Sequence, residues 1–214
     1  MIYLDSKVDT IHFGNQSIEL LLPNQEEVKR VYKTLSEQNS NTPFPYWTQV
    51  WPSAIAMAQF IVQNPHYFLG KHVVELAAGL GLPSFVVAQF AKNVYCTDYL
   101  QEAVEVMKQS ATLNRIKNIS CGLVDWNNIT EDFPKTDVVL LSDINYNPDD
   151  FELLFRVLTT FLQQHCLIVL TTPQRLLAKP FIEKLMPFCS LSQEIEIIHL
   201  GKEVPISVLV LSLK

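Results

Sequence analysis

The chain has 214 residues, 48% of them apolar and 18% charged, and its 16 basic and 22 acidic residues give a net charge of −6 at pH 7. This composition excludes a disordered chain, and the sequence has no apolar run of about 18 residues that would span a bilayer. Lys and Arg form no cluster, so we expect neither a nucleic-acid partner nor a membrane partner.

Cysteine and histidine spacing indicates no metal site. The four cysteines are far apart and form no C-x-x-C pair: Cys96, Cys121, Cys166 and Cys189. We expect four buried, reduced thiols, and the five scattered histidines show no metal-ligand spacing. The N-terminal residues lack the pattern of a signal peptide, so we expect a cytoplasmic protein. The sequence does not indicate an oligomeric state.

The N-terminal residues are typical of a small extension. Residues 2–22 alternate apolar and polar side chains around Gly14-Asn15, which predicts a hairpin or two short strands. Residues 24–27 resemble a capping box and lead into apolar residues at helical spacing, which predicts an amphipathic helix over 25–38. The predicted domains are a hairpin-and-helix extension at 1–45 and a main domain at 46–214.

In the main domain, helical stretches and short apolar runs alternate. A helix is predicted to run from Ser53, as its N-cap, to about Gln63. Further helices are predicted at 83–90, 101–114, 149–163 and 176–186, and strands at 72–76, 94–97, 119–124, 138–141, 167–171, 195–199 and 206–213. Apolar strands that alternate with helices indicate a parallel sheet covered on both faces.

Only residues 201–205 separate the last two predicted strands. This linker is too short for a crossover helix, so the last strand should run antiparallel to its neighbour. We therefore expect an α/β fold: a Rossmann-like, seven-stranded, mostly parallel sheet with helices on both faces and an antiparallel last strand, plus the small N-terminal hairpin and helix.

A glycine-containing loop follows the first strand of this sheet, in the segment 75-ELAAGLGLP-83. Gly79 and Gly81 lie between a strand and a helix, where small residues let the backbone approach a ligand. Pro83 suits the first helical position, because no N–H is needed there. Asp98 ends the next strand, where a carboxylate can bind ribose hydroxyls. The alternative is a tight turn with an exposed Asp.

Further polar and aromatic residues lie at strand ends. Glu75 could meet the amino group of a methionine moiety, whereas it would repel a dinucleotide pyrophosphate. Asp125 could accept from an adenine amino group and Trp126 could stack on its ring. The segment 142–146 ends the fourth strand, beside the switch point of such a sheet. Alternatively, Trp126 is a core-edge residue, Asp125 caps a turn, and Asp143 begins a turn before a helix capped within 147–149.

Taken in order, these motifs resemble the class I, seven-β-strand S-adenosylmethionine methyltransferases. More narrowly, the chain resembles the lysine-methyltransferase-like family (methyltransferase family 16) with its D-x-x-Y/F motif, here Asp143-Ile-Asn-Tyr146. The matching stretch covers about residues 44–182 and includes Trp51-Pro52-Ser53. Members methylate lysines of chaperones, elongation factors and the electron-transfer flavoprotein β-subunit, so the resemblance implies a protein substrate bearing a lysine.

The resemblance also implies a site for S-adenosylmethionine, with no metal. The implied cofactor contacts are Trp51 at the methionine end, the loop residues Ala77, Ala78 and Gly79, the ribose ligand Asp98, the adenine neighbour Trp126, and Ser142. Asp143 would hold the incoming ammonium and Tyr146 would wall the acceptor site. The family usually has Gly at the position of Ala77, which puts cofactor affinity in question.

Other functions stay open at this point. A small-molecule amine, a glutamine amide or adenine N6 could be the methyl acceptor, although the enzymes that use an N/D-P-P-Y/F turn have two prolines that this motif lacks. An inactive cofactor-binding interaction module is the non-enzyme alternative. Tyr67 and Lys71 have the Y-x-x-x-K spacing of a short-chain dehydrogenase, but they precede the glycine strand, whereas that class has them well after it.

Overall fold

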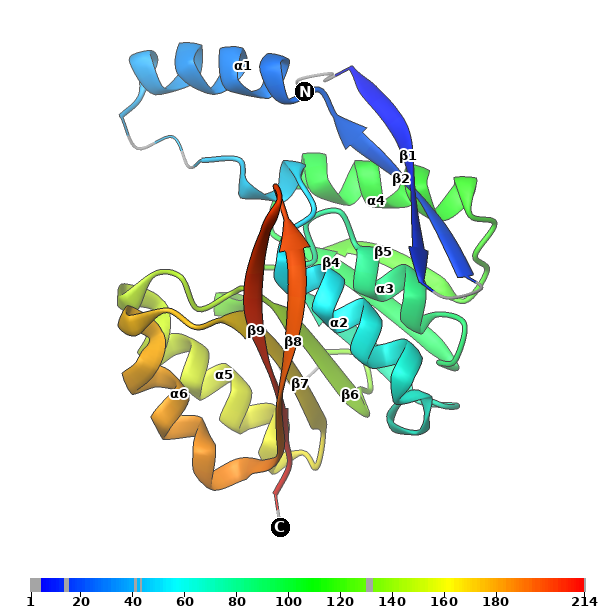
Figure 1. Cartoon of the computed structure of the whole chain (residues 1–214), viewed down its shortest axis with the longest axis vertical. Helices are drawn as coiled ribbons and strands as arrows, with labels where there is room; N and C mark the ends of the chain where they lie inside the picture. Colours follow the sequence, from blue (N-terminus) through cyan, green and yellow to red (C-terminus); the bar gives the residue numbers. More distant parts are fainter. Residues whose placement is uncertain (1–4, 14–15, 41, 43, 130–132, 214) are drawn as a thin grey trace.

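The computed structural model describes residues 5–13, 16–40, 42, 44–129 and 133–213. A sheet of seven strands, in the order β5-β4-β3-β6-β7-β9-β8, forms its centre (Figure 1). The strands are β3 (His72–Leu76), β4 (Asn93–Asp98), β5 (Ile119–Leu123), β6 (Val138–Ser142), β7 (Leu167–Pro173), β8 (Cys189–His199) and β9 (Lys202–Leu211). β9 runs antiparallel to β7 and β8, and the other pairs are parallel. The predicted fold is confirmed.

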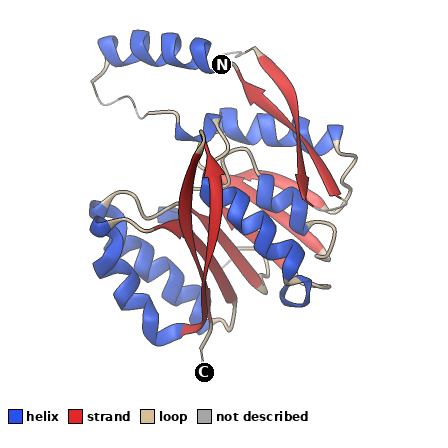
Figure 2. Ribbon diagram, in the orientation of Figure 1, coloured by secondary structure: helices blue, strands red, loops and turns tan. Residues whose placement is uncertain are grey.

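Helices cover both faces of this sheet (Figure 2). One face packs against α2 (Pro52–Gln63), α3 (Leu82–Val87) and α4 (Gln101–Leu113), and the other against α5 (Phe151–Gln163) and α6 (Lys179–Leu185). Neighbouring residues of β6 divide between the two cores, since Val138 and Leu140 face the first and Val139 and Leu141 the second. A strand covered on both faces buries every side chain, which explains its unbroken apolar sequence.

The N-terminal extension begins with two antiparallel strands, β1 (Ser6–Phe13) and β2 (Gln16–Pro23), as predicted. The expected turn at Gly14-Asn15 lies outside the described residues. The side chain of Leu20 is fully buried in the same core as α2, α3 and α4. The extension therefore shares its core with the main domain, and the boundary at residue 45 stays a prediction.

The C-cap residue of α4 also binds the hairpin. The side-chain amide of Asn114, which follows the last residue of α4, pairs with the backbone of Glu19 in β2 as a neighbouring strand would. Its Oδ1 accepts from the Glu19 N–H at 2.9 Å, and its Nδ2 donates to the Glu19 carbonyl at 2.6 Å. The amide thereby satisfies both backbone groups of an edge strand that would otherwise depend on water.

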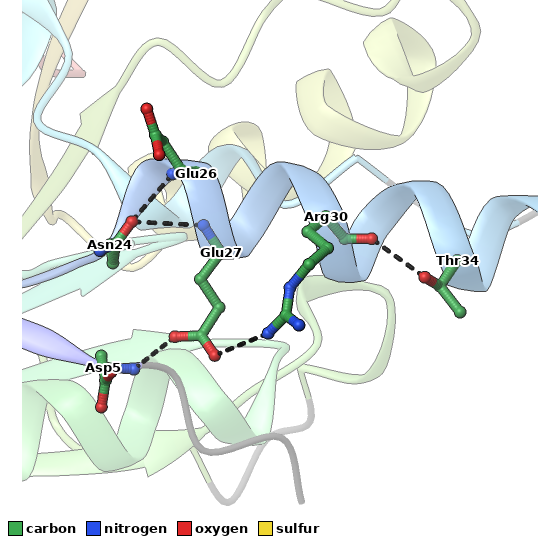
Figure 3. Close-up of polar contacts among 6 residues, drawn as sticks. All are labelled: Asp5, Asn24, Glu26, Glu27, Arg30 and Thr34. Atoms are coloured by element: carbon green, nitrogen blue, oxygen red, sulfur yellow. Dashed lines mark hydrogen bonds and ion pairs between the residues drawn. The ribbon is translucent and has the colours of Figure 1, made fainter.

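Figure 3 shows the start of α1 (Gln25–Gln38). The Asn24 Oδ1 accepts from the backbone N–H groups of Glu26 and Glu27 at 3.0 and 3.3 Å, so Asn24 is the N-cap. The reciprocal half of the predicted capping box is wrong, because the Glu27 carboxylate accepts from the Asp5 N–H at 2.7 Å. The Asn24 N–H donates instead to the Asp5 carbonyl, also at 2.7 Å. The backbone before β1 thus takes the place of the second box contact.

The start of α2 differs from the prediction by one residue. Pro52 is in its first turn and Trp51 is its N-cap, so Ser53 lies inside the helix and does not cap it. Proline is tolerated there because the first helical N–H groups have no intrahelical partner. The Ser53 side chain is fully buried, and its Oγ has no hydrogen-bond partner among the described residues.

The last two strands are longer than predicted. β8 and β9 begin at Cys189 and Lys202, and Leu200 and Gly201, both at positive φ, form the turn between them. β8 is an edge strand whose residues largely alternate between partly buried and exposed. Polar residues are therefore acceptable along it, and a search for apolar runs finds only its most apolar part.

The expectation of four buried thiols is correct for Cys96 and Cys166 only. Cys121 and Cys189 are partly exposed, because they lie on the edge strands β5 and β8. All four are free. No helix within the described ranges is long and apolar enough to cross a membrane.

Leu20 tests whether the hairpin belongs to the cooperative core. Leu20→Ala removes a fully buried side chain, so we expect the free energy of unfolding to fall by about 2–5 kcal/mol. The measurement is urea denaturation followed by far-UV circular dichroism. Val8→Ala on β1 is the control, since Val8 is 50% exposed and should change little. Equal small losses for the two variants would show that the hairpin folds independently.

Candidate functional site

A cavity of about 770 Å³ opens at the carboxyl ends of the parallel strands. Its walls come from the segment before α2, the β3–α3 loop, the ends of β4, β5 and β6, and the loop after β7. Eleven expected site residues line it: Trp51, Ala77, Ala78, Gly79, Gly81, Asp98, Asp125, Trp126, Ser142, Asp143 and Tyr146. The location agrees with the general rule that ligands bind at this edge of open α/β sheets.

The loop between β3 and α3 makes its turn with left-handed backbone at three positions. Gly79 and Gly81 have φ of 57° and 77°, and Ala77 has φ of 52°. A Cβ on Gly81 would lie 3.0 Å from the Cys96 Sγ, which is a tight contact, and the positive φ also favours glycine there. Ala77 lies at a position that favours glycine, which gives its departure from the family pattern a physical meaning. Pro83 is the second residue of α3 instead of the first.

Asp98 holds this loop against the end of β4. Its carboxylate accepts from the Gly79 N–H at 2.9 Å and from the Leu100 N–H at 3.1 Å. The side chain is nearly buried, and burial raises its pKa although the backbone N–H groups oppose that rise. Each oxygen accepts one bond and keeps capacity for another. Asp98 is therefore placed to accept hydrogen bonds from hydroxyl groups in the cavity.

Glu75 does not line the cavity, unlike the other expected residues. It is 1% exposed, and its Oε2 accepts from the Ser84 N–H at 2.9 Å and from the Ser84 Oγ at 2.6 Å. Burial raises its pKa to about 8, against the lowering effect of the two Ser84 bonds. Its neighbour Leu76 lines the cavity instead. Glu75 thus braces the first turn of α3 from behind the loop.

Asp125 and Trp126 each combine the two roles considered from the sequence. The Asp125 carboxylate caps the short 3-10 helix that follows, by accepting from the Asn127 N–H at 2.9 Å. It also lines the cavity. Trp126 packs at the edge of the core beside α5 and presents part of its surface to the cavity.

Aromatic side chains form one wall of the cavity. The ring of Tyr46 lies 4.8 Å from that of Phe44, 6.0 Å from that of Trp51 and 5.3 Å from that of Tyr146. The Trp51 Nε1 also donates to the Tyr46 carbonyl at 2.8 Å. Phe44 and Tyr46 were not expected in the site, because their segment has the Pro- and Asn-rich sequence of a loop. Their aromatic character was the available signal.

Asp143 begins the turn after β6 with left-handed backbone, at φ of 58°. Its N–H donates to the Thr171 carbonyl of β7 at 2.8 Å, which fixes its position. The carboxylate binds both terminal nitrogens of Arg175, with Nη2 3.0 Å from Oδ2 and Nη1 on Oδ1. Burial raises the pKa of Asp143, and Arg175 counteracts that rise. Arg175 also lines the cavity, and no motif in the sequence indicates it.

Two buried polar side chains near Asp143 lack partners in the described part of the chain. Ser142 lines the cavity, but its Oγ is buried and makes no hydrogen bond with a described residue, and both amide atoms of Asn145 are likewise unpaired. A buried polar group without a partner costs free energy. Within the described ranges, no group of three His, Cys, Asp or Glu side chains could hold a metal ion.

Because the backbone at Ala77 is left-handed, we expect glycine at this position to make the folded chain more stable. Non-glycine residues pay about 1–2 kcal/mol in this conformation, and glycine pays about 0.4–1 kcal/mol in unfolded-chain entropy. We expect Ala77→Gly to raise the free energy of unfolding by about 0.5–1 kcal/mol, measured by urea denaturation. Ala78→Gly is the matched control, because Ala78 does not have positive φ and should lose stability. A loss in both variants would contradict this account.

Glu75 predicts a pH-dependent stability. The folded chain keeps the Glu75 proton up to a pKa of about 8, whereas the unfolded value is 4.5. The folded state therefore binds more protons between these values, and stability falls as pH rises through this window. Glu75→Gln cannot ionise, so its stability relative to the parent should rise by more than about 1 kcal/mol between pH 5 and pH 8. Glu105→Gln, on the exposed face of α4, is the control. Parallel pH profiles for parent and Glu75→Gln would rule out this effect.

Curated relatives match about half of the chain. Histone-arginine methyltransferase METTL23 of Homo sapiens is 32% identical over 108 residues, which is 48% of this chain and 57% of that protein. The electron transfer flavoprotein beta subunit lysine methyltransferase of Danio rerio is 31% identical over 107 residues, or 49% of this chain and 40% of that protein. The chain thus spans about half the length of the curated relatives it matches.

Solved structures share the fold at low identity. A putative RNA methyltransferase, PH1948 from Pyrococcus horikoshii, has a TM-score of 0.60 and 18% identity, over 84% of this chain and 97% of that one. SMU.776, a putative methyltransferase complexed with SAH, has a TM-score of 0.66 and 13% identity, over 96% of this chain and 56% of that one. The family model described as lysine methyltransferase matches residues 33–187, which include the cavity-lining residues. The chain belongs to this lysine methyltransferase family, as the motifs predicted.

Proposed function

We propose that the chain is an S-adenosylmethionine-dependent N-methyltransferase whose acceptor is a lysine side chain of a protein. The observation that carries this proposal is the single cavity that joins the glycine loop and Asp98 to Asp143 and Tyr146. Membership of the lysine methyltransferase family supports the reaction class. The relatives named for histone arginine and for the electron transfer flavoprotein support a protein as acceptor.

The cavity residues fit the cofactor. Asp98 would accept from the two ribose hydroxyls, and Trp126 and Asp125 would meet the adenine. Ser142 lines the same cavity. Gly79 and Trp51 would line the methionine end, while Glu75 acts through the loop that it braces. When bound, S-adenosylmethionine supplies an electrophilic methyl group.

The part of the cavity at Asp143, Tyr146 and Tyr46 is called the acceptor end here. Methyl transfer requires that the lysine amine is neutral when it reacts there. A lysine with a pKa of about 10.4 pays about 4.6 kcal/mol to lose its proton at pH 7. The wall residues Phe44, Tyr46 and Tyr146 are about half exposed, so an acceptor side chain that packs against them would displace water. A drier site lowers the pKa of an ammonium. Tyr146 and Tyr46 would pack against the acceptor side chain, and the Asp143 carboxylate would bind and orient its nitrogen.

An arginine acceptor is the second candidate. Asp143 already accepts both terminal nitrogens of a guanidinium in this structure, that of Arg175. The METTL23 relative is named for histone arginine. A free amine, a glutamine amide, adenine N6 and an inactive binding module remain as alternatives, and a cytoplasmic location stays a prediction.

Two variants should separate cofactor binding from transfer. Asp98→Ala removes charge-assisted bonds worth about 1.5–3 kcal/mol each, so we expect at least tenfold weaker binding of S-adenosylmethionine by calorimetry, roughly as one lost bond predicts. Asp143→Asn should keep that affinity but reduce methyl transfer by about 10²–10³. Transfer is measured with isotope-labelled cofactor and a cell lysate, with mass spectrometry of the labelled bands.

Four outcomes would count against the proposal. Absence of cofactor binding by the parent chain at millimolar concentration excludes the reaction class. A parallel loss of affinity and transfer in Asp143→Asn makes Asp143 a cofactor or folding residue. Undiminished transfer in Asp143→Asn excludes it from the acceptor end, and label on nucleic acid or small molecules alone would replace the protein acceptor.

A further inference from the structure

The Asp143–Arg175 ion pair occupies the carboxylate that an acceptor cation would need. Both carboxylate oxygens are engaged by the planar guanidinium, and only 9% of the Asp143 side chain remains exposed. A two-point contact between Arg and a carboxylate is among the stronger ion pairs in proteins. An entering ammonium or guanidinium therefore meets a compensated pair and not a free anion.

The two partners differ in their freedom to move. Asp143 is fixed by its left-handed backbone, by the end of β6 and by the bond to the Thr171 carbonyl. Arg175 lies outside any helix or strand, between Pro173 and the 3-10 turn at Leu176, and its side chain is 35% exposed. Its long side chain can turn into water while its charge stays hydrated. Arg175 is thus the partner that can leave.

Sharing of the carboxylate by two cations is unfavourable here. A second cation would lie a few ångströms from the guanidinium, and like charges repel strongly where water is scarce. Little of the Asp143 surface remains open to a second donor. Exchange of one cation for the other satisfies the carboxylate in both states and leaves no buried charge unpaired.

We propose that Arg175 is a specificity-determining residue of the acceptor end: its guanidinium occupies the Asp143 carboxylate until a cationic acceptor side chain displaces it. The inference deepens the proposed function and rests on Asp143 as the acceptor-binding group. It follows that acceptors must outcompete an internal arginine. An amine that makes only one weak contact is excluded, whereas a side chain held by further contacts with the aromatic wall gains entry.

The test uses small cations as probes of the acceptor end. n-Butylammonium and n-butylguanidinium carry the cations of lysine and arginine side chains. Each is titrated by calorimetry at pH 8 into the full chain saturated with S-adenosylhomocysteine, the demethylated cofactor. The variants are Arg175→Gln, which removes the competitor, and Arg175→Lys, which keeps the charge but loses the two-point contact. Lys179→Gln is the control, because it removes one nearby positive charge that does not line the cavity.

We expect Arg175→Gln to bind both probes about tenfold more tightly than the parent, as the loss of about 1.4 kcal/mol of competition predicts. The probe affinity of Arg175→Lys should lie between those of the parent and Arg175→Gln. The probe affinity of Lys179→Gln should equal that of the parent. The double variant Asp143→Asn/Arg175→Gln should lose the gain. Equal or weaker probe binding by Arg175→Gln, with its S-adenosylhomocysteine affinity intact, would overturn the inference.

A gain of similar size in Lys179→Gln would also overturn it, since the effect would then reflect net charge. These results are distinguishable from a failure of the proposed function. If the parent chain does not bind S-adenosylhomocysteine, the reaction class is wrong. If it does bind and only the gain in probe affinity is missing, the inference about Arg175 fails alone.

Discussion

Asp98 makes the interaction on which the rest of the site depends. Its carboxylate joins the Gly79 and Leu100 N–H groups, so the loop after β3 and the turn after β4 are fixed to one another. Behind the loop, Glu75 does the same for the start of α3 through Ser84. Two buried carboxylates thus hold the glycine loop from both sides, and the cavity keeps its shape although left-handed residues form its edge.

The two ends of the cavity are held by different kinds of interaction. At the glycine loop, backbone N–H groups donate to the buried carboxylates of Asp98 and Glu75 and to backbone carbonyls, which leaves little freedom. The opposite end contains the Asp143–Arg175 ion pair and the half-exposed Tyr146, and Ser142 and Asn145 nearby in the sequence have unpaired buried polar atoms. A rigid glycine loop suits a cofactor that is always the same. Exchangeable contacts at the other end suit the proposed selection among acceptor side chains.

The sequence predicted the central strands well, because buried parallel strands are apolar throughout. It underestimated β8, since an edge strand with one exposed face carries polar residues, and it missed the polar first residues of β9, which pair with β8. Glu75 illustrates a different limit. Its position beside the loop was visible, but the face of β3 from which it projects was not, and Leu76 faces the cavity instead.

No sequence motif could have identified Arg175 as a site residue. It meets Asp143 across 32 positions of sequence, and the contact exists only because β6 and β7 are neighbours in the sheet. Its segment has no glycine loop, acidic pair or aromatic pattern that would single it out. Residues whose role arises from strand order are found only once the order is known.

The aromatic wall comes from a segment outside the seven-stranded sheet. Phe44, Tyr46 and Trp51 lie between α1 and α2 and contact one another. The ring of Tyr46 also contacts that of Tyr146, which follows β6. None of the sheet's backbone pairing passes through them. Sequence change in this stretch therefore alters the shape of the acceptor end without touching the buried carboxylates that hold the glycine loop. Substitution of Phe44 or Tyr46 can therefore change which acceptors fit while the strand pairing of the sheet stays the same.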